Sequence, residues 1–194
     1  MPALDEALRD VTTILDQLEL RYAVGGSVAA AIHGFARSAN DLDMLVEIQP
    51  NSDAALAGAL RPSWYFADGA VRAAVELHGS FSAMHLRLHW KVDFFVAGAS
   101  ALDHAQLDRC ASVALGGTLT QPVRVSSAEL MVLRKLDWLR RRSGASDVHW
   151  FDALGMLKVQ AGRLDEAWMR RAAAGLGVTD LLDRALRLQG PPPR

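Results

Sequence analysis

The sequence predicts an α/β fold followed by a helical C-terminal part. Up to about residue 125, short runs typical of strands alternate with alanine-rich runs that have helical periodicity. From residue 126 onward, four segments have helical spacing. A chain of 194 residues is long enough for one α/β core and a smaller helical part. We therefore expect an α/β core over residues 1–125, a helical subdomain over 126–190 and a disordered tail over 191–194.

The first half contains all the predicted strands. Apolar residues at Leu4, Leu8 and Val11 follow a helical period and predict the first helix. The strand that begins at Asp41 is the clearest in the sequence, and Pro50 ends it. The expected strands are 22–25, 41–48, 81–88, 90–96, 112–115 and 122–125, and the expected helices are 4–19, 27–33 and a helix capped by Asn51 or Ser52 that runs to about residue 60.

The second half is expected to be a helical bundle. Ser126 and Glu129 form a capping-box pattern at the start of a long helix. A Ser-Gly-Ala-Ser stretch then breaks the helical pattern. The expected helices are 126–142, one from Ser146 or Asp147 to about 160, 165–174 and 179–188.

Composition excludes several classes of protein. The 51% hydrophobic content excludes disorder as the default state, and the net charge of −1 excludes a uniformly basic nucleic-acid binder. No apolar stretch approaches the length of about 20 residues that a membrane helix needs, and the N-terminus has no secretory pattern. The single cysteine, Cys110, cannot form an internal disulfide and has no activating partner. We expect a cytoplasmic protein with no membrane contact.

A glycine-rich turn and an Asp-x-Asp strand are the first candidate site. Strand alternation places Asp41 and Asp43 on one face, where two carboxylates repel each other unless a cation lies between them. Carboxylate oxygens suit Mg²⁺. Gly25-Gly26-Ser27 lies between a predicted strand and a predicted helix, where free N–H groups suit a phosphate. The alternative for a lone Asp-x-Asp is a solvated edge strand.

Asp93 is a third candidate carboxylate. It lies in the middle of an apolar strand, where a carboxylate is costly unless it meets a cation. The alternation also places Lys91 beside it, so a simple Lys91–Asp93 ion pair is the alternative.

These motifs resemble the nucleotidyltransferase superfamily related to DNA polymerase β. More narrowly, their order resembles the small AbiEii/MenT-type nucleotidyltransferases, which are toxins of toxin–antitoxin pairs. The resemblance covers residues 20–188. The matching motifs are Gly25-Gly26-Ser27, His33-Gly34-Phe35-Ala36-Arg37, Asp41-Leu42-Asp43, Lys91-Val92-Asp93, the helix from Lys135 to Arg140, and Asp152.

The resemblance implies a polymerase-β-like fold, in which a mixed sheet flanked by helices precedes a helical bundle. It also implies that Asp41, Asp43 and Asp93 hold one or two Mg²⁺ ions that bridge a nucleoside triphosphate. Gly26 and Ser27 would contact the triphosphate, and Arg37 is a candidate phosphate ligand or a partner of a surface carboxylate.

The second half adds weaker candidates. In the toxin family, a helix lysine that matches Lys135 contacts the nucleotide, and an aspartate that matches Asp152 completes the site. A solvated lysine, and an aspartate paired with a nearby arginine, are the alternatives. One interpretation of Arg140, Arg141 and Arg142 is an RNA-binding patch. The other is a set of basic residues at a helix C-terminus, where positive charge interacts favourably with the helix dipole.

The expected function is therefore Mg²⁺-dependent transfer of a nucleoside monophosphate from an NTP to an acceptor hydroxyl, with release of pyrophosphate. The resemblance implies a toxin that modifies the tRNA 3′ end, blocks translation and is restrained by a separately encoded antitoxin. Two alternatives remain open. One is a small-molecule nucleotidyltransferase of the aminoglycoside type, and the other is a non-catalytic binding or antitoxin module that keeps the fold.

Overall fold

The computed structural model describes residues 2–35, 41–114, 122–141 and 148–189. The chain forms two compact units: Met1–Val28 with Ser38–Ser126, and Ala29–Arg37 with Ser127–Arg194. The predicted tail, 191–194, lies outside the described residues.

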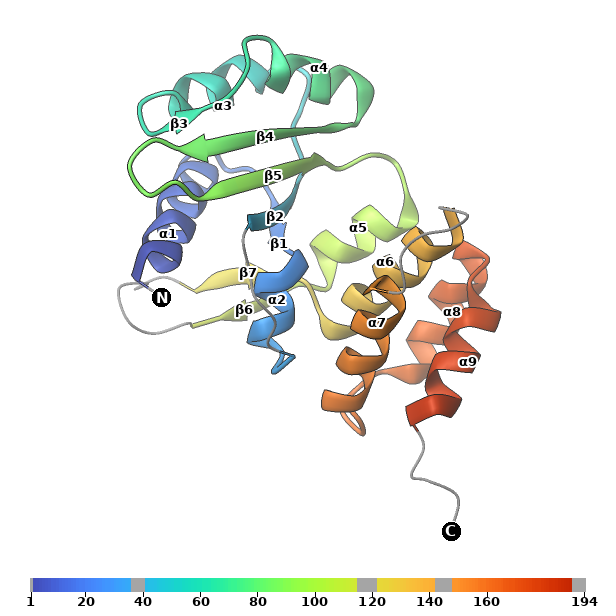
Figure 1. Cartoon of the computed structure of the whole chain (residues 1–194). Helices are drawn as coiled ribbons and strands as arrows, with labels where there is room; N and C mark the ends of the chain where they lie inside the picture. Colours follow the sequence, from blue (N-terminus) through green and yellow to red (C-terminus); the bar gives the residue numbers. More distant parts are fainter. Residues whose placement is uncertain (1, 36–40, 115–121, 142–147, 190–194) are drawn as a thin grey trace. The chain divides into compact units, whose positions relative to one another are not determined.

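The first unit is built on a mixed sheet of seven strands within the described residues, in the order β3-β4-β5-β2-β1-β7-β6 (Figure 1). β2 pairs with β5, and β1 with β7, in parallel. The other neighbours are antiparallel. The strands are β1 (Tyr22–Val24), β2 (Asp41–Val46), β3 (Trp64–Tyr65), β4 (Ser80–His85), β5 (Lys91–Val96), β6 (Ala111–Val113) and β7 (Val123–Val125).

Helices supply the rest of this unit's core. α1 (Pro2–Gln17) contacts α3 (Asp53–Leu60), and α4 (Ala70–Leu77) contacts α3, β4 and β5 (Figure 1). α5 (Ala101–Asp108) contacts β1 and β2, and its Leu107 packs with Ala23 and Leu45. Apolar burial is the main force that holds these helices in place.

The structure contains three elements that the sequence-based prediction left out: β3, α4 and α5. α4 carries a clear signal, because its buried Val71, Ala74 and Val75 have helical spacing. α5 has a weaker apolar stripe, but Ser100 caps it by accepting a hydrogen bond from the backbone N–H of Asp103 at 3.1 Å. β3 has two residues, too few for a strand pattern to be recognised.

The second unit is helical, as predicted. Its helices are α6 (Ala128–Arg141), α7 (Val148–Val159), α8 (Glu166–Leu176) and α9 (Thr179–Gln189), and α2 (Gly26–Ile32) continues into it from the first unit. α6 contacts α7, α8 and α9 (Figure 1). A Cβ on Gly155 would lie 2.2 Å from the ring of Phe35, so a side chain there would displace this ring. None of the described helices has both the length and the apolar composition needed to cross a membrane.

A buried histidine at the end of β4 contacts both α1 and the turn between β4 and β5. The Nδ1 atom of His85 accepts hydrogen bonds from the backbone N–H groups of Arg87 and Leu88, each at 3.2 Å. Its Nε2 atom faces Asp10 at 3.6 Å, and Asp10 accepts a hydrogen bond from Trp64 at 2.8 Å. Burial lowers the pKa of His85 below its usual 6.5, although the charge of Asp10 acts in the opposite direction.

This lowered pKa gives stability a defined pH dependence. As the pH falls, the unfolded chain takes up the proton at a higher pH than the folded chain does. The contribution of neutral His85 is therefore fully present above pH 6.5 and is lost as the pH falls through its pKa in the folded state. We expect the thermal midpoint to decline less for His85→Gln than for the wild type when the pH drops from about 7.5 to about 5.

The exposed His104 supplies the control, and His104→Gln should keep the wild-type slope. Thermal melts at a series of pH values measure both variants. An identical slope in the wild type and His85→Gln would show that His85 does not couple folding to protonation.

Candidate functional site

The parallel pairing of β2 with β5 brings the predicted carboxylates together. Asp43 lies opposite Asp93, and Asp41 lies opposite Lys91. Because side chains alternate along a strand, these four residues share one face of the sheet. The residues that alternate with them on the two strands are fully buried, so the opposite face of the sheet is apolar: Leu42, Met44, Val92 and Phe94.

An ammonium group lies between two of these carboxylates. The Nζ atom of Lys91 is 2.7 Å from Oδ2 of Asp93 and 3.4 Å from Oδ2 of Asp41. The Lys91–Asp93 ion pair considered as an alternative is therefore present, and it extends to Asp41. The hydrogen bond to Asp93, and then the charges of both carboxylates, raise the pKa of Lys91 above its usual 10.5. Lys91 remains an ammonium ion at neutral pH.

Ser82 on β4 is a site residue that the sequence did not identify. It lies opposite Asp93 in the antiparallel β4–β5 pair, and its hydroxyl donates a hydrogen bond to Oδ1 of Asp93 at 2.5 Å. Both oxygens of Asp93 thus have partners, one a hydroxyl and the other the Lys91 ammonium. The alternation of β4 indicates which face Ser82 occupies, but only the strand register shows that it meets Asp93.

The Gly25-Gly26-Ser27 turn lies against Asp43. The backbone N–H of Gly25 donates to the carbonyl of Asp43 at 2.7 Å. Gly26 has φ of +57°, and a Cβ there would lie 1.7 Å from Oδ2 of Asp43. The turn therefore needs glycine for two reasons, its backbone conformation and the close approach of the carboxylate. The buried Oγ of Ser27 makes no hydrogen bond within the described part of the chain.

The donor chemistry of this cluster fits a divalent cation. Asp41, Asp43 and Asp93 offer carboxylate oxygens, the ligands that Mg²⁺ prefers. Asp41 and Asp93 already contact one cation, the ammonium of Lys91. Among the described residues, no group of three or more His, Cys, Asp or Glu side chains is yet arranged to hold a metal ion. In this arrangement Lys91 lies next to Asp41 and Asp93, while Asp43 lies against Gly26.

The second unit brings together the other predicted pair. Lys135 on α6 and Asp152 on α7 form an ion pair of 2.9 Å, with 21% and 12% of their side chains exposed. Lys135 is thus not a simple solvated lysine. A half-buried ion pair can position the ammonium and also connect two helices.

The predicted arginine patch is engaged within the protein. Arg140 pairs with Asp180 on α9, and Arg141 pairs with Asp137 one turn earlier at 2.9 Å. Arg142 and the candidate phosphate ligand Arg37 lie outside the described residues.

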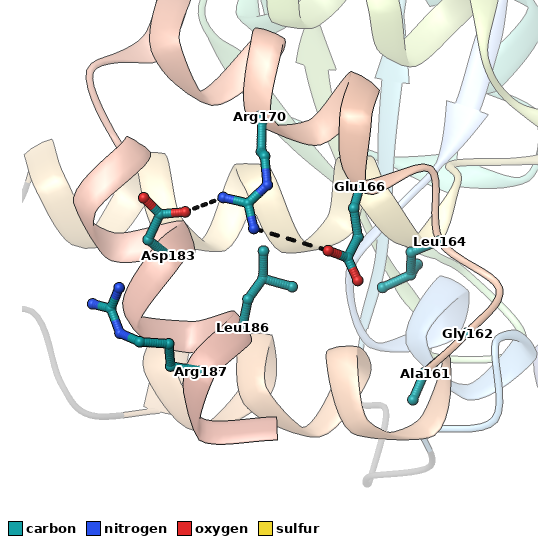
Figure 2. Close-up of a pocket in the computed structure, with 8 residues that line it drawn as sticks. All are labelled: Ala161, Gly162, Leu164, Glu166, Arg170, Asp183, Leu186 and Arg187. Atoms are coloured by element: carbon teal, nitrogen blue, oxygen red, sulfur yellow. Dashed lines mark hydrogen bonds and ion pairs between the residues drawn. The ribbon is translucent and has the colours of Figure 1, made fainter. Parts of the chain in front are cut away.

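A pocket of about 390 Å³ in the second unit contains none of the predicted site residues (Figure 2). Arg170 points between Glu166 and Asp183, and Arg187 also lines the pocket (Figure 2). Two guanidinium groups and two carboxylates leave the lining of this pocket without net charge.

No family model matches the sequence, and no curated protein matches it. Solved structures do match the fold. An antigenic nucleotidyltransferase-like protein from Paracoccidioides brasiliensis aligns with a TM-score of 0.59 and 15% identity over 96% of this chain and 93% of that chain. ANT(2″)-Ia in complex with adenylyl-2″-tobramycin aligns with a TM-score of 0.60 and 14% identity over 90% and 97% of the two chains. The solution structure of ANT(2″)-Ia gives a TM-score of 0.58. The chain has the nucleotidyltransferase fold that the sequence predicts.

The contact between Gly26 and Asp43 generates a stability prediction. Gly26→Ala must strain the backbone at positive φ and also displace the carboxylate of Asp43. We expect it to lower the free energy of unfolding by about 1–3 kcal/mol more than a glycine substitution that introduces backbone strain alone.

Gly69 is the matched control, because its φ is +75° and nothing lies within 4 Å of where its Cβ would be. Urea unfolding of Gly26→Ala and Gly69→Ala measures the difference. Equal losses of stability would mean that Asp43 does not depend on the glycine.

Proposed function

We propose that this protein is a Mg²⁺-dependent nucleotidyltransferase that transfers a nucleoside monophosphate from an NTP to an acceptor hydroxyl and releases pyrophosphate. One observation carries the proposal. Three carboxylates on two paired strands lie beside a Gly-Gly-Ser turn, on a chain with the nucleotidyltransferase fold.

Asp41, Asp43 and Asp93 would hold one or two Mg²⁺ ions. Bound Mg²⁺ lowers the pKa of an attacking hydroxyl and neutralises charge on a phosphate leaving group. Ser82 would orient Asp93 through its hydrogen bond to Oδ1, which leaves Oδ2 directed toward the cation position. Gly26 would contact the triphosphate, together with the hydroxyl of Ser27, which has no hydrogen-bond partner among the described residues.

Lys135 and Arg37 would add positive charge toward the nucleotide, with Asp152 positioning the Lys135 ammonium through its ion pair. Lysine suits this role because its flexible stem carries a compact charge to a phosphate oxygen.

For the acceptor, we favour a small molecule with a free hydroxyl. Arg140 and Arg141 are paired with carboxylates of the same unit, so each would have to exchange a partner to bind an RNA phosphate. The net charge of −1 provides no general attraction for RNA. The complex of ANT(2″)-Ia with adenylyl-2″-tobramycin suggests the aminoglycoside class as the first to test.

The tRNA 3′ end is the second candidate acceptor, with a separately encoded antitoxin as the partner. The Lys135–Asp152 contact favours it, because this pair is the part of the sequence that resembles the toxin branch.

The deciding experiment incubates the protein with each of the four α-labelled NTPs, Mg²⁺, and either total tRNA or a panel of aminoglycosides. Labelled aminoglycoside supports the favoured acceptor, and labelled tRNA supports the second candidate. A protein that neither transfers label nor binds NTP in the presence of Mg²⁺ is a non-catalytic module, which would contradict the proposal.

The carboxylates should be essential for this activity. We expect Asp41→Asn and Asp43→Asn each to reduce transfer at least about a hundredfold, because each removes a charged metal ligand. The thermal midpoint should change little, since the substitution also relieves repulsion among the carboxylates.

Asp68→Asn is the matched control, because the Asp68 side chain is 92% exposed on the same unit. Transfer at the wild-type rate by folded Asp43→Asn protein would rule out the proposed metal site.

Substitution of Lys135 tests whether the second unit contributes to nucleotide transfer. Lys135→Ala should reduce transfer at least about tenfold and raise the NTP concentration needed, because a charge contact to phosphate is lost. Lys135→Arg should restore part of the activity. Lys158, exposed on α7, is the control. If Lys135→Ala and Lys158→Ala proteins are equally active, the ion pair with Asp152 has a structural role only.

A further inference from the structure

We propose that Lys91 is a built-in competitor for the metal site: its ammonium occupies the cation position between Asp41 and Asp93 and must leave when a divalent cation binds. This inference rests on the nucleotidyl transfer proposed above and concerns how the same site is controlled. It assigns Lys91 a second position, beside the triphosphate, once the metal has bound.

The contacts of Asp93 show why the two cations exclude each other. Oδ1 accepts a hydrogen bond from the hydroxyl of Ser82, and Oδ2 accepts one from the ammonium of Lys91 at 2.7 Å. The same ammonium lies 3.4 Å from Oδ2 of Asp41. A metal bound by both aspartates would take the oxygens that Lys91 now contacts. The hydroxyl of Ser82 is neutral and can remain when the metal binds. The ammonium of Lys91 is positively charged, so a metal ion bound to the same carboxylates repels it.

The energy needed to move Lys91 is small. Its side chain is 38% exposed, so solvent already screens the ion pairs, and such pairs contribute little stability each. Its four-carbon stem also allows the ammonium to swing away without moving β5. Lys91 therefore neutralises the carboxylates while no metal is bound and does not block the metal permanently.

The displaced ammonium creates coupling between the two ligands. A triphosphate brings several negative charges to the edge of the same cluster, and Lys91 can pair with a phosphate oxygen there. When the metal binds without nucleotide, the ammonium of Lys91 loses its contacts with the two aspartates and gains no new partner. When the nucleotide is bound as well, the ammonium gains a phosphate oxygen as its partner. The two ligands should then each raise the affinity for the other, as linkage requires.

The test measures binding of Mn²⁺, from the loss of the free-ion electron paramagnetic resonance signal, so it does not depend on turnover. The proteins are the wild type, Lys91→Met, Lys91→Gln, Lys91→Arg, Asp43→Asn and the exposed-lysine control Lys158→Met. Each is titrated with Mn²⁺ alone, and again with a non-hydrolysable analogue of the transferred NTP.

We expect Lys91→Met to bind Mn²⁺ alone about three- to tenfold more tightly than the wild type, because the partly exposed ion pairs of Lys91 with Asp93 and Asp41 no longer have to be broken. The enhancement by the nucleotide analogue should shrink by a similar factor. Lys91→Arg and Lys158→Met should match the wild type. Lys91→Gln, which keeps a polar side chain, should repeat the result if Lys91→Met folds poorly.

The outcomes separate this inference from the function on which it rests. Equal Mn²⁺ affinity in the wild type, Lys91→Met and Lys91→Gln would overturn the competition, while binding that Asp43→Asn abolishes would leave the metal site standing. Weaker Mn²⁺ binding in both Lys91 variants would show that Lys91 supports the metal, which also overturns the inference. No Mn²⁺ binding by any of the proteins would overturn the metal site and the inference together.

Discussion

The parallel pairing of β2 with β5 is the constraint on which the proposed site depends. It sets Asp43 opposite Asp93 and Asp41 opposite Lys91, which concentrates three negative charges on one face of the sheet. Repulsion among them opposes this register. The buried face of the sheet opposes any change of register, because a slip by one residue would expose side chains such as Leu42 or Phe94. Burial of each such side chain contributes about 1.5–3 kcal/mol. Apolar packing on one face therefore holds together a charged cluster on the other.

Neighbouring elements complete the cluster in different ways. The glycine turn brings backbone against Asp43 so closely that no side chain fits at Gly26. β4 contributes the Ser82 hydroxyl, which orients Asp93, and β5 contributes Lys91, which partly neutralises the charge. Asp41 and Asp93 thus already contact one cation of the protein's own, the ammonium of Lys91. In the proposed site, stability without metal and affinity for metal would both depend on these carboxylates, and Lys91 would influence both.

Sequence patterns were sufficient for the α/β class of the fold and for placing Asp41 and Asp43 on one face of their strand, because alternation along a strand is a local property. The grouping of Asp93 with these two aspartates was implied only by the family resemblance. Sequence patterns were not sufficient for contacts that depend on pairing between strands. Ser82 meets Asp93, and Lys91 reaches Asp41, only because of the register of β4, β5 and β2. The short β3 and the weakly amphipathic α5 also escaped, since their formation depends on tertiary contacts. Arg140 and Arg141 are paired with Asp180 and Asp137. Sequence spacing does not reveal that Asp180 lies near Arg140, because the two residues are on different helices.

The most direct test of the central claim is the position of a divalent cation in crystals of the protein grown with Mn²⁺ and a non-hydrolysable NTP analogue. Anomalous scattering locates manganese without reference to the protein's activity. We expect a manganese peak coordinated by Asp41, Asp43 and Asp93, with the ammonium of Lys91 moved away from Asp93 toward the triphosphate. Manganese bound elsewhere, with Lys91 still paired to Asp41 and Asp93, would contradict the claim.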